Sequence, residues 1–449
     1  MTNQEKYDLL AGNEVGIPSC MAVIARDKNF EFTEKQIEEA LKSNKEFKLV
    51  SFSAIEEPDP LVADYDTKIE YKGETYHVRL YVDEVKNLSL SEYGFANSID
   101  EESLQIATSQ PFFLGVELDF GDNPLESFHL QLKIMNAVVP DASLCVDFTS
   151  LRLLAAQWLA MTAKSATPPS PNYLYTIHGV YDQKSDDETF YWFHTHGLHR
   201  CKSVELEMVN IKQYPEQMHT LLNMIVTRFL NDAAKEKETF MVGYDGMGID
   251  MCWLRWEEAL KDFPADILGG LNERQEENNV HAEPVGVIYA VQDGNMISPE
   301  IYGKTLADNP IYYISNEETQ RMSDLAKERF HFYKEVFDKE APKPEKKSLF
   351  GKLFKKEEEK TNWGFIVKLG LDVDSADDMA SNKEHLWYDV IAIDENNNIT
   401  GKLLNQPYWI SNLNEGDVAT YPLDLLTDWM IYGPEKTYTS DTIYELGFK

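Results

Sequence analysis

The sequence predicts an α+β protein, with mixed or antiparallel sheets and packed helices in its N-terminal region and a small β-rich module at its C-terminal end. Three observations predict this class. Short apolar runs with strand spacing recur along the chain, helical patterns fall between them, and one charged segment separates the last strands from the rest. At about 150 residues per domain, a chain of 449 residues has roughly three domains.

We expect four segments along the chain. Residues 1–98 form a small α+β domain, 99–340 a larger α+β domain, 341–362 a charged flexible linker and 363–449 the β-rich module. The linker holds two prolines, a lysine cluster and three consecutive glutamates, without a useful apolar face. A short amphipathic helix around Phe350 that touches a membrane or a partner is the alternative to a solvated linker.

The strands expected before the linker share short apolar or alternating patterns, and the β-α-β-β order at the start suits a small sheet with one helix on it. They lie at residues 20–26, 48–55, 74–83, 112–120, 143–148, 173–181, 190–194 and 204–211.

The helices expected there show apolar residues at steps of three and four, together with recognisable N-terminal caps. Asn123 precedes Pro124, an arrangement that favours a helix start. Thr149 or Ser150 is expected to cap a helix that carries Leu153. The other expected helices lie at residues 34–43, 124–139, 215–231 and, as one long helix opened by a capping box at Ser315, 315–337.

After the linker, alternating patterns predict short strands joined by polar turns. They lie at residues 364–371, 385–394, 399–404, 416–423 and 426–432. So many short strands within about 85 residues predict a small, strongly bent sheet or barrel.

The charge of the chain excludes several functions. Its 77 acidic and 42 basic side chains give a net charge of −35. This charge repels nucleic acid and anionic membrane surfaces, so neither is an expected partner. The first ten residues lack the basic start and apolar core of a signal peptide, and no apolar run approaches the roughly 20 residues of a spanning helix. We therefore expect a cytoplasmic protein without stable membrane insertion.

Four scattered cysteines, none in a CxxC pair, fit a reducing compartment and give no sign of a redox dithiol. They are Cys20, Cys145, Cys201 and Cys252.

One cluster of histidines suggests metal chemistry. His194, His196 and His199 are followed by Cys201, and these side chains are ligand types that suit zinc. Residues two apart on a strand share a face, so His194 and His196 are placed to chelate one ion. Gly197 would let the chain turn and bring His199 round. Histidines that bond backbone carbonyls or lie on the surface are the simpler interpretation, because short motifs often match by chance.

Other motifs do not match known catalytic or ligand-binding sites. Residues 243–248 are glycine-rich but lack the lysine of a P-loop, and residues 394–405 lack the glycine and glutamate of a calcium loop. The sequence contains no G-x-S-x-G motif. No catalytic residue or cofactor is therefore predicted, and the sequence favours a protein that is not an enzyme.

The C-terminal segment carries five separated motifs in fixed order. They are His385-Leu386-Trp387, Ile399-Thr400-Gly401, Asn405-Gln406-Pro407-Tyr408, Gly416-Asp417-Val418 and Asp428-Trp429-Met430. Together they resemble the bacterial domain-of-unknown-function family 2314. The longer N-terminal part resembles domain-of-unknown-function family 4026 at residues 163–175, 194–201 and 256–270. The resemblance implies a bacterial cytoplasmic origin and this domain order, and it transfers no catalytic residue.

Within the module, the Gly416-Asp417 turn before Val418 resembles the entry to a strand of an SH3-like barrel. Tyr408, Trp409 and Trp429 are candidates for an aromatic groove that takes an extended peptide. Their use as the core of the module is the alternative, because so small a domain needs its large aromatics inside.

Two functions are left as hypotheses. The first is a non-enzymatic protein-binding role, adaptor-like or immunity-like, in which the acidic surface suits a basic partner. The alternative is a metal-dependent hydrolase centred on His194, His196 and His199, with zinc as the expected ion. Whether these histidines converge distinguishes the two.

Overall fold

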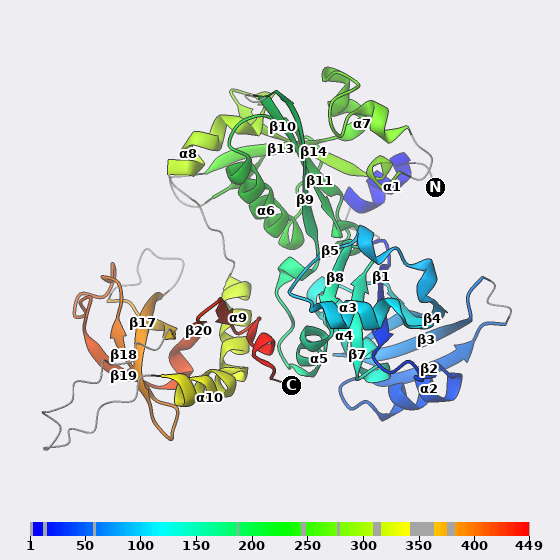
Figure 1. Cartoon of the computed structure of the whole chain (residues 1–449). Coiled ribbons are helices and arrows are strands. Elements are labelled where there is room, and N and C mark those ends of the chain that lie inside the picture. Colours follow the sequence, from blue (N-terminus) through cyan, green and yellow to red (C-terminus); the bar gives the residue numbers. More distant parts are fainter. Residues whose placement is uncertain are drawn as a thin grey trace, which may run out of the picture. The chain divides into compact units, whose positions relative to one another are not determined.

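The computed structural model describes residues 3–11, 16–56, 60–185, 188–243, 248–275, 279–308, 316–341, 363–374 and 382–448. These residues belong to two compact units (Figure 1). The N-terminal unit comprises residues 1–163 and 171–313, and the C-terminal unit comprises residues 164–170 and 314–449. Helices and sheets occur in both units, which confirms the α+β class.

The first sheet of the N-terminal unit has eight strands in the order β2-β3-β4-β6-β1-β7-β8-β5. All neighbours are antiparallel except the pair of β5 with β8. The strands are β1 (Ser19–Ala25), β2 (Lys48–Ala54), β3 (Ala63–Tyr71), β4 (Glu74–Glu84), β5 (Gly94–Phe95), β6 (Phe112–Leu118), β7 (Ala142–Asp147) and β8 (Arg152–Ala155).

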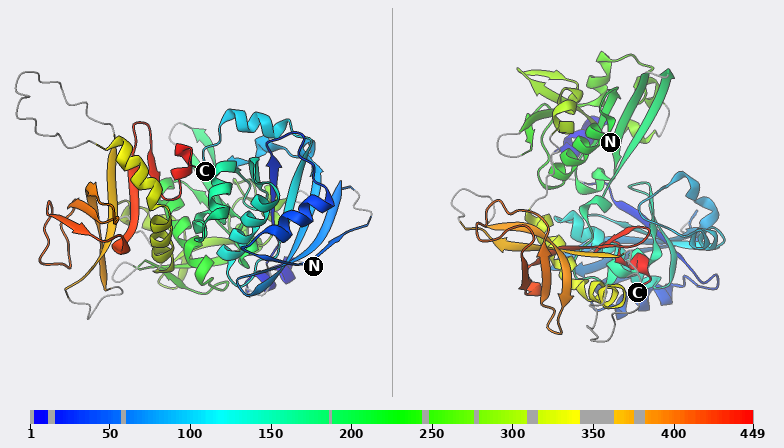
Figure 2. Two further views of the ribbon diagram at one scale, coloured as in Figure 1. Left: turned by 90° about the horizontal axis from the view of Figure 1, so that it is seen from below. Right: turned by 60° about the vertical axis from the view of Figure 1, so that its left-hand side comes forward.

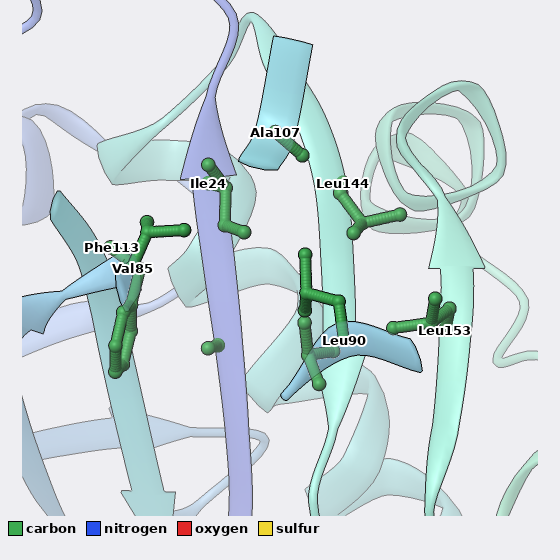
Figure 3. Packing of buried hydrophobic residues seen from close by; sticks show 9 residues of the cluster. Ile24, Val85, Leu90, Ala107, Phe113, Leu144 and Leu153 are labelled. Carbon is green, nitrogen blue, oxygen red and sulfur yellow. The ribbon is translucent and has the colours of Figure 1, made fainter. Parts of the chain in front are cut away.

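Helices cover this sheet because their apolar stripes match its faces. α2 (Glu34–Ser43), which starts at a Thr33 capping box, and α4 (Pro124–Val138), capped by Asn123, pack together near β2, β6 and β1. α3 (Glu101–Thr108) packs on β7. Figure 3 shows the core beneath α3, where Ala107 meets Ile24, Leu144 and Leu153. α5 (Ala156–Lys164) lies beside α4, and α1 (Asn3–Ala11) contacts the second sheet, where the Tyr7 hydroxyl donates to the carbonyl of Val285 at 2.9 Å.

The second sheet of the N-terminal unit holds the candidate site. Its order is β12-β13-β14-β11-β10-β9, with β15 on β14, and β11 and β14 are its parallel pair. The strands are β9 (Thr176–Ser185), β10 (Glu188–His196), β11 (Glu205–Ile211), β12 (Phe240–Val242), β13 (Ile249–Arg255), β14 (Val285–Gln292) and β15 (Asn295–Ile297).

Each face of the second sheet is covered differently. α6 (Pro215–Asn231), which has the predicted bounds, lies against β9, β10 and β11. The opposite face is covered by α7 (Trp256–Ala259) and the residues up to 271, whose side chains pack around Trp192 and Val287, and by His281 on Trp192. α8 (Gly303–Asp308) follows and contacts α6.

A buried ion pair joins the two sheets of the N-terminal unit. Arg200 lies directly after the histidine motif, and its guanidinium binds both carboxylate oxygens of Asp147 at 3.1 and 2.9 Å. Both residues are fully buried. Arg200 also donates hydrogen bonds to Ser19 and to the carbonyls of Tyr173 and Leu174.

The C-terminal unit contains a six-stranded antiparallel sheet in the order β19-β18-β17-β16-β20-β21, with the helices on β20 (Figure 2). The elements are α9 (Asn316–Glu328), α10 (Phe330–Glu340), β16 (Gly364–Asp372), β17 (Lys383–Ile393), β18 (Ile399–Leu403), β19 (Val418–Tyr421), β20 (Leu426–Tyr432) and β21 (Thr437–Thr439). This linear order is that of an open sheet, so the SH3-like barrel stays a prediction.

The C-terminal unit also includes a short segment from the middle of the chain. Ser165, Ala166 and Thr167 donate four hydrogen bonds to the Glu328 carboxylate at the end of α9. Arg321 of the same helix donates to the carbonyl of Pro168. Residues 164–170 therefore belong to the same unit as α9, although Pro168 and Arg321 are 153 residues apart in the chain.

Several expectations were wrong. No boundary falls near residue 98, because β1 and β4 pair with β6 in one sheet. Leu153 lies in β8 rather than in a helix, and α5 begins only at Ala156. The single helix expected up to residue 337 is two helices that belong to the C-terminal unit, and its capping residue Ser315 lies outside the described residues, as do linker residues 342–362.

Candidate functional site

Four histidines gather on one face of the second sheet. β9 and β10 form an antiparallel hairpin in which His194 stands directly opposite His178. His196 follows two residues after His194 and therefore lies on the same face. The fourth, His281, belongs to the short 3-10 helix Val280–Ala282, in the segment that covers this face.

The rings of His194 and His196 each neighbour the other three imidazole rings. The ring centres of His178, His194 and His196 lie 4.9–5.5 Å from one another. The ring centre of His281 lies 4.6 Å from that of His194 and 5.3 Å from that of His196. One potential ligand atom from each of His178, His194 and His196 lies within 4.8 Å of the other two. The hairpin thus supplies three converging nitrogen donors.

The four histidines differ in how much of each side chain is exposed to solvent. His194 is 4% exposed and His196 is 9% exposed, whereas His178 and His281 are half-buried. The Nδ1 atom of His194 is buried and has no hydrogen-bond partner. Among the described residues, no ring nitrogen of the four histidines forms a hydrogen bond with a polar group.

Two other buried histidines each have one ring nitrogen in contact with a backbone carbonyl oxygen. His129 contacts the carbonyl oxygen of Thr162 at 2.9 Å, and His199 contacts that of Pro284 at 2.8 Å. Buried polar groups normally have such partners, because an unpaired one costs about 1–3 kcal/mol. The cluster differs from these two histidines, because none of its four rings has such a contact among the described residues.

Electrostatics keep these imidazoles neutral. Burial, followed by the neighbouring histidines, lowers the pKa of His194 far below its ordinary value and the pKa of His196 to about 3. Burial and the charge of Arg274 lower the pKa of His281 to about 4. Burial also lowers the pKa of His178. At neutral pH all four rings hold free nitrogen lone pairs, the form that binds metal.

Charged residues behind the cluster are already paired. Arg274 donates to both carboxylate oxygens of Glu207, at 2.8 and 2.7 Å, and both residues are buried. Glu207 also accepts a hydrogen bond from Trp192 Nε1 at 2.9 Å. The ring of Trp192 lies 4.0 Å from that of His194 and 4.7 Å from that of His281. This network fixes the indole against the histidines.

Glu205 shapes the turn that ends β10. One of its oxygens accepts from the Thr195 hydroxyl at 2.5 Å, and the other accepts from the backbone N–H groups of Gly197 and His199. Gly197 has a φ of +116°, and a Cβ there would lie 2.4 Å from the Leu174 carbonyl oxygen. Glu205 and Glu207 therefore hold the strand and its turn rather than facing solvent.

Two of the four predicted metal ligands lie outside the cluster. The turn at Gly197 carries His199 away from His194 and His196, into its contact with the Pro284 carbonyl oxygen. The Cys201 sulfur lies 4.0 Å from the Gly197 carbonyl oxygen. Burial raises the pKa of the Cys201 thiol to about 12, so it is not a thiolate. Of the predicted set, the structure brings His194 and His196 together and places His199 and Cys201 elsewhere.

Comparison with known families places this cluster in a recognised part of the chain. The model described as protein of unknown function (DUF4026), N-terminal, matches residues 19–169, and its C-terminal counterpart matches residues 177–289. Residues 345–447 match an uncharacterized protein family conserved in bacteria (DUF2314). The chain is a DUF4026 region followed by a DUF2314 region. No curated protein and no solved structure matches it.

The four histidines all lie within the C-terminal DUF4026 match. Two of them, His178 and His281, were missed from the sequence. His178 had a signal, because antiparallel pairing of two neighbouring predicted strands can set residue 178 opposite residue 194. His281 had none, since its position depends on the parallel pairing of β11 with β14.

The DUF2314 region separates the three aromatic candidates. Trp429 is fully buried, and its indole N–H donates to the Ala326 carbonyl at 3.0 Å. It therefore belongs to the core and not to a groove. Tyr408 and Trp409 are 88% and 55% exposed.

Among the residues that the structure describes, no helix has the length and apolar character needed to cross a membrane.

Proposed function

We propose that this protein binds one divalent transition-metal ion through His178, His194 and His196. The observation that carries the proposal is the convergence of three imidazole nitrogens within 4.8 Å of one another, without other hydrogen-bond partners among the described residues. Three histidines are a ligand set that zinc uses widely.

The ring spacing supports a single shared ion. Imidazoles bound tetrahedrally to one ion, with metal–nitrogen distances of about 2.0–2.1 Å, have ring centres about 5 Å apart. The three spacings in the hairpin are 5.5, 4.9 and 5.0 Å. Small ring rotations are therefore enough to bring the nitrogens onto one ion.

The chemistry of the donors selects the class of ion. Neutral imidazole suits zinc, copper, nickel and iron, whereas magnesium, calcium and manganese prefer oxygen ligands. The two carboxylates on the neighbouring strand β11, Glu205 and Glu207, are occupied by hydrogen bonds and by Arg274. The set is thus suited to a borderline transition metal.

The test is metal content and affinity in the full-length protein, purified without an affinity histidine tag and without chelators. We expect about one ion per chain, and His196→Gln should weaken Zn²⁺ binding by at least about tenfold. His219→Gln is the matched control, because His219 is an exposed histidine on α6 that contacts the Phe193 ring. His199→Gln should also retain the ion. Metal far below one ion per chain in the unaltered protein would contradict the proposal.

A second candidate function, protein docking by the C-terminal unit, has its own observation. The exposed Tyr408 and Trp409 stand on a loop whose backbone is fixed. Their N–H groups donate to the two oxygens of Glu384 at 2.8 and 3.0 Å, and the N–H of Ser411 donates to Asp374 at 2.7 Å. Rigid exposed aromatics are typical anchors of protein interfaces. The net charge of −35 fits an adaptor-like role with a basic partner.

Capture from the native host with the tagged full-length protein tests this role. A specific partner should be retained at low and moderate salt, and the double substitution Tyr408→Ser, Trp409→Ser should release it. Ile391→Ser is the control, because it removes a comparably exposed apolar side chain from β17. Equal capture by all three proteins, or no specific partner, would contradict docking through this loop.

A further inference from the structure

We infer that His281 is the fourth ligand of the metal centre, so that the centre is a closed four-imidazole site rather than an open hydrolytic one. This inference rests on the proposed binding of a metal by His178, His194 and His196. It assigns a role to a residue on a different segment, and it decides what kind of chemistry the centre supports.

The first argument is the position of the His281 ring. Its centre lies 4.6 Å from that of His194 and 5.3 Å from that of His196, close to the spacings among the other three rings. Tetrahedral coordination requires ring centres about 5 Å apart at metal–nitrogen distances of about 2.0–2.1 Å. His281 thus lies at the distance of a fellow ligand from two of the three proposed ligands, His194 and His196.

The second argument is that the ring nitrogens of His281 lack polar partners. Neither of its ring nitrogens has a hydrogen-bond partner among the described residues, although the ring is half-buried. A half-buried ring nitrogen without a polar partner is free to bind an ion beside His194 and His196, whose rings it contacts.

The third argument is that hydrogen bonds hold the backbone around His281. The Asn279 side chain accepts a hydrogen bond from the His281 N–H at 2.8 Å, and Arg274 donates to the His281 carbonyl at 2.6 Å. Arg274 is itself held by Glu207. The ring is therefore presented to the hairpin by a fixed backbone, as in a prepared ligand site.

Closure has a consequence for function. Structural metal sites fill all four tetrahedral positions with protein ligands, whereas catalytic zinc sites leave one position for water or substrate. With His281 bound, the ion would join β9, β10 and the covering segment around residue 281. The centre would then hold the sheet and its cover together and would not hydrolyse esters or phosphoesters.

The experiment uses the full-length protein freed of metal and titrated with Co²⁺ alone, and then with Zn²⁺ in competition. We expect the strong visible absorption of four-coordinate Co²⁺ in the unaltered protein. His281→Gln should weaken the absorption as water enters, and should reduce Zn²⁺ affinity by at least about tenfold. His281→Cys restores a ligand and should recover the affinity, with a new thiolate-to-metal absorption band. The control His219→Gln should change nothing.

The outcomes separate this inference from the proposal beneath it. If the unaltered protein binds Co²⁺ and His281→Gln gives the same affinity and spectrum, His281 is no ligand and the inference is overturned while the metal centre stands. If the unaltered protein binds neither Co²⁺ nor Zn²⁺, the metal centre itself is refuted. Metal-dependent turnover of a nitrophenyl ester or phosphoester by the unaltered protein would also overturn closure.

Discussion

Replacement of Arg200 by methionine should severely destabilise the N-terminal unit. Arg200 and Asp147 are 0% exposed and make two hydrogen bonds with each other. Methionine keeps an apolar stem beside Phe128, over whose ring the guanidinium lies at 5.0 Å. The substitution therefore removes the charge and its hydrogen bonds while it preserves much of the packing.

The magnitude depends on what remains at Asp147. Its carboxylate keeps three donors, the N–H groups of Thr149 and Ser150 and the hydroxyl of Ser150. It loses the counter-ion that it contacts in the described part of the chain, and a buried charge left without its partner costs about 3–5 kcal/mol. The carbonyl of Leu174 also loses two donor contacts, so we expect a loss at the upper end of this range.

Hydrogen exchange of the amides in β1 and β7 measures this loss of unfolding free energy. Both strands belong to the N-terminal unit, so unfolding of the C-terminal unit does not affect the measurement. Lys48→Met is the control, since the Lys48–Glu70 pair is 73% and 46% exposed and such pairs are worth about 0–1 kcal/mol. Arg200→Lys keeps a charge and should lose less, which provides a measurement if Arg200→Met does not fold. A loss below about 1 kcal/mol for Arg200→Met would refute the reasoning.

Three further perturbations have defined outcomes. Burial raises the pKa of Asp428 to about 6 from 3.8, so the folded state binds the proton more tightly and stability falls as the pH rises between these values. Asp428→Asn should therefore match the unaltered protein near pH 3.5 and exceed it at pH 7 by up to about 3 kcal/mol in thermal unfolding; equal stability at pH 7 would contradict this. Trp429→Phe should lose about 1–3 kcal/mol, measured by urea unfolding of the C-terminal unit, because the Ala326 carbonyl loses its N–H donor. Gly197→Ala should lower the melting temperature of the N-terminal unit, because an added Cβ meets the Leu174 carbonyl oxygen in a left-handed backbone; an unchanged melting temperature would count against that geometry.

Local signals in the sequence predicted individual elements well. The Asn123–Pro124 cap and the Pro215 start fixed α4 and α6, because capping residues act within one helical turn. Leu153 shows the limit of such signals. A short apolar run before a helix fits a strand or a helix equally well, and Leu151 with a φ of +56° turns the chain so that β8 precedes α5.

Nonlocal pairing explains the rest of the errors. β1 lies between β6 and β7, strands that come about a hundred residues later in the chain, so no boundary separates residues 1–98 from the next segment. Composition shifts mark the ends of segments and do not report such pairing. Nonlocal pairing also explains why only some of the site residues could be found from the sequence. His194 and His196 were found from their spacing on one strand, whereas His281 reaches them only through tertiary structure.

The unsatisfied state of the histidine cluster links stability to function. Each buried polar group without a partner costs about 1–3 kcal/mol, and the cluster contains the Nδ1 atom of His194 in this state. The other three rings bring nitrogens without described hydrogen bonds to the same place. A bound ion would satisfy these atoms at once, and its binding free energy would add to the stability of the folded state. The feature that makes the metal-free hairpin costly to fold is thus the feature that would make it bind an ion, and a hydrogen-bonded histidine such as His199 offers no such gain.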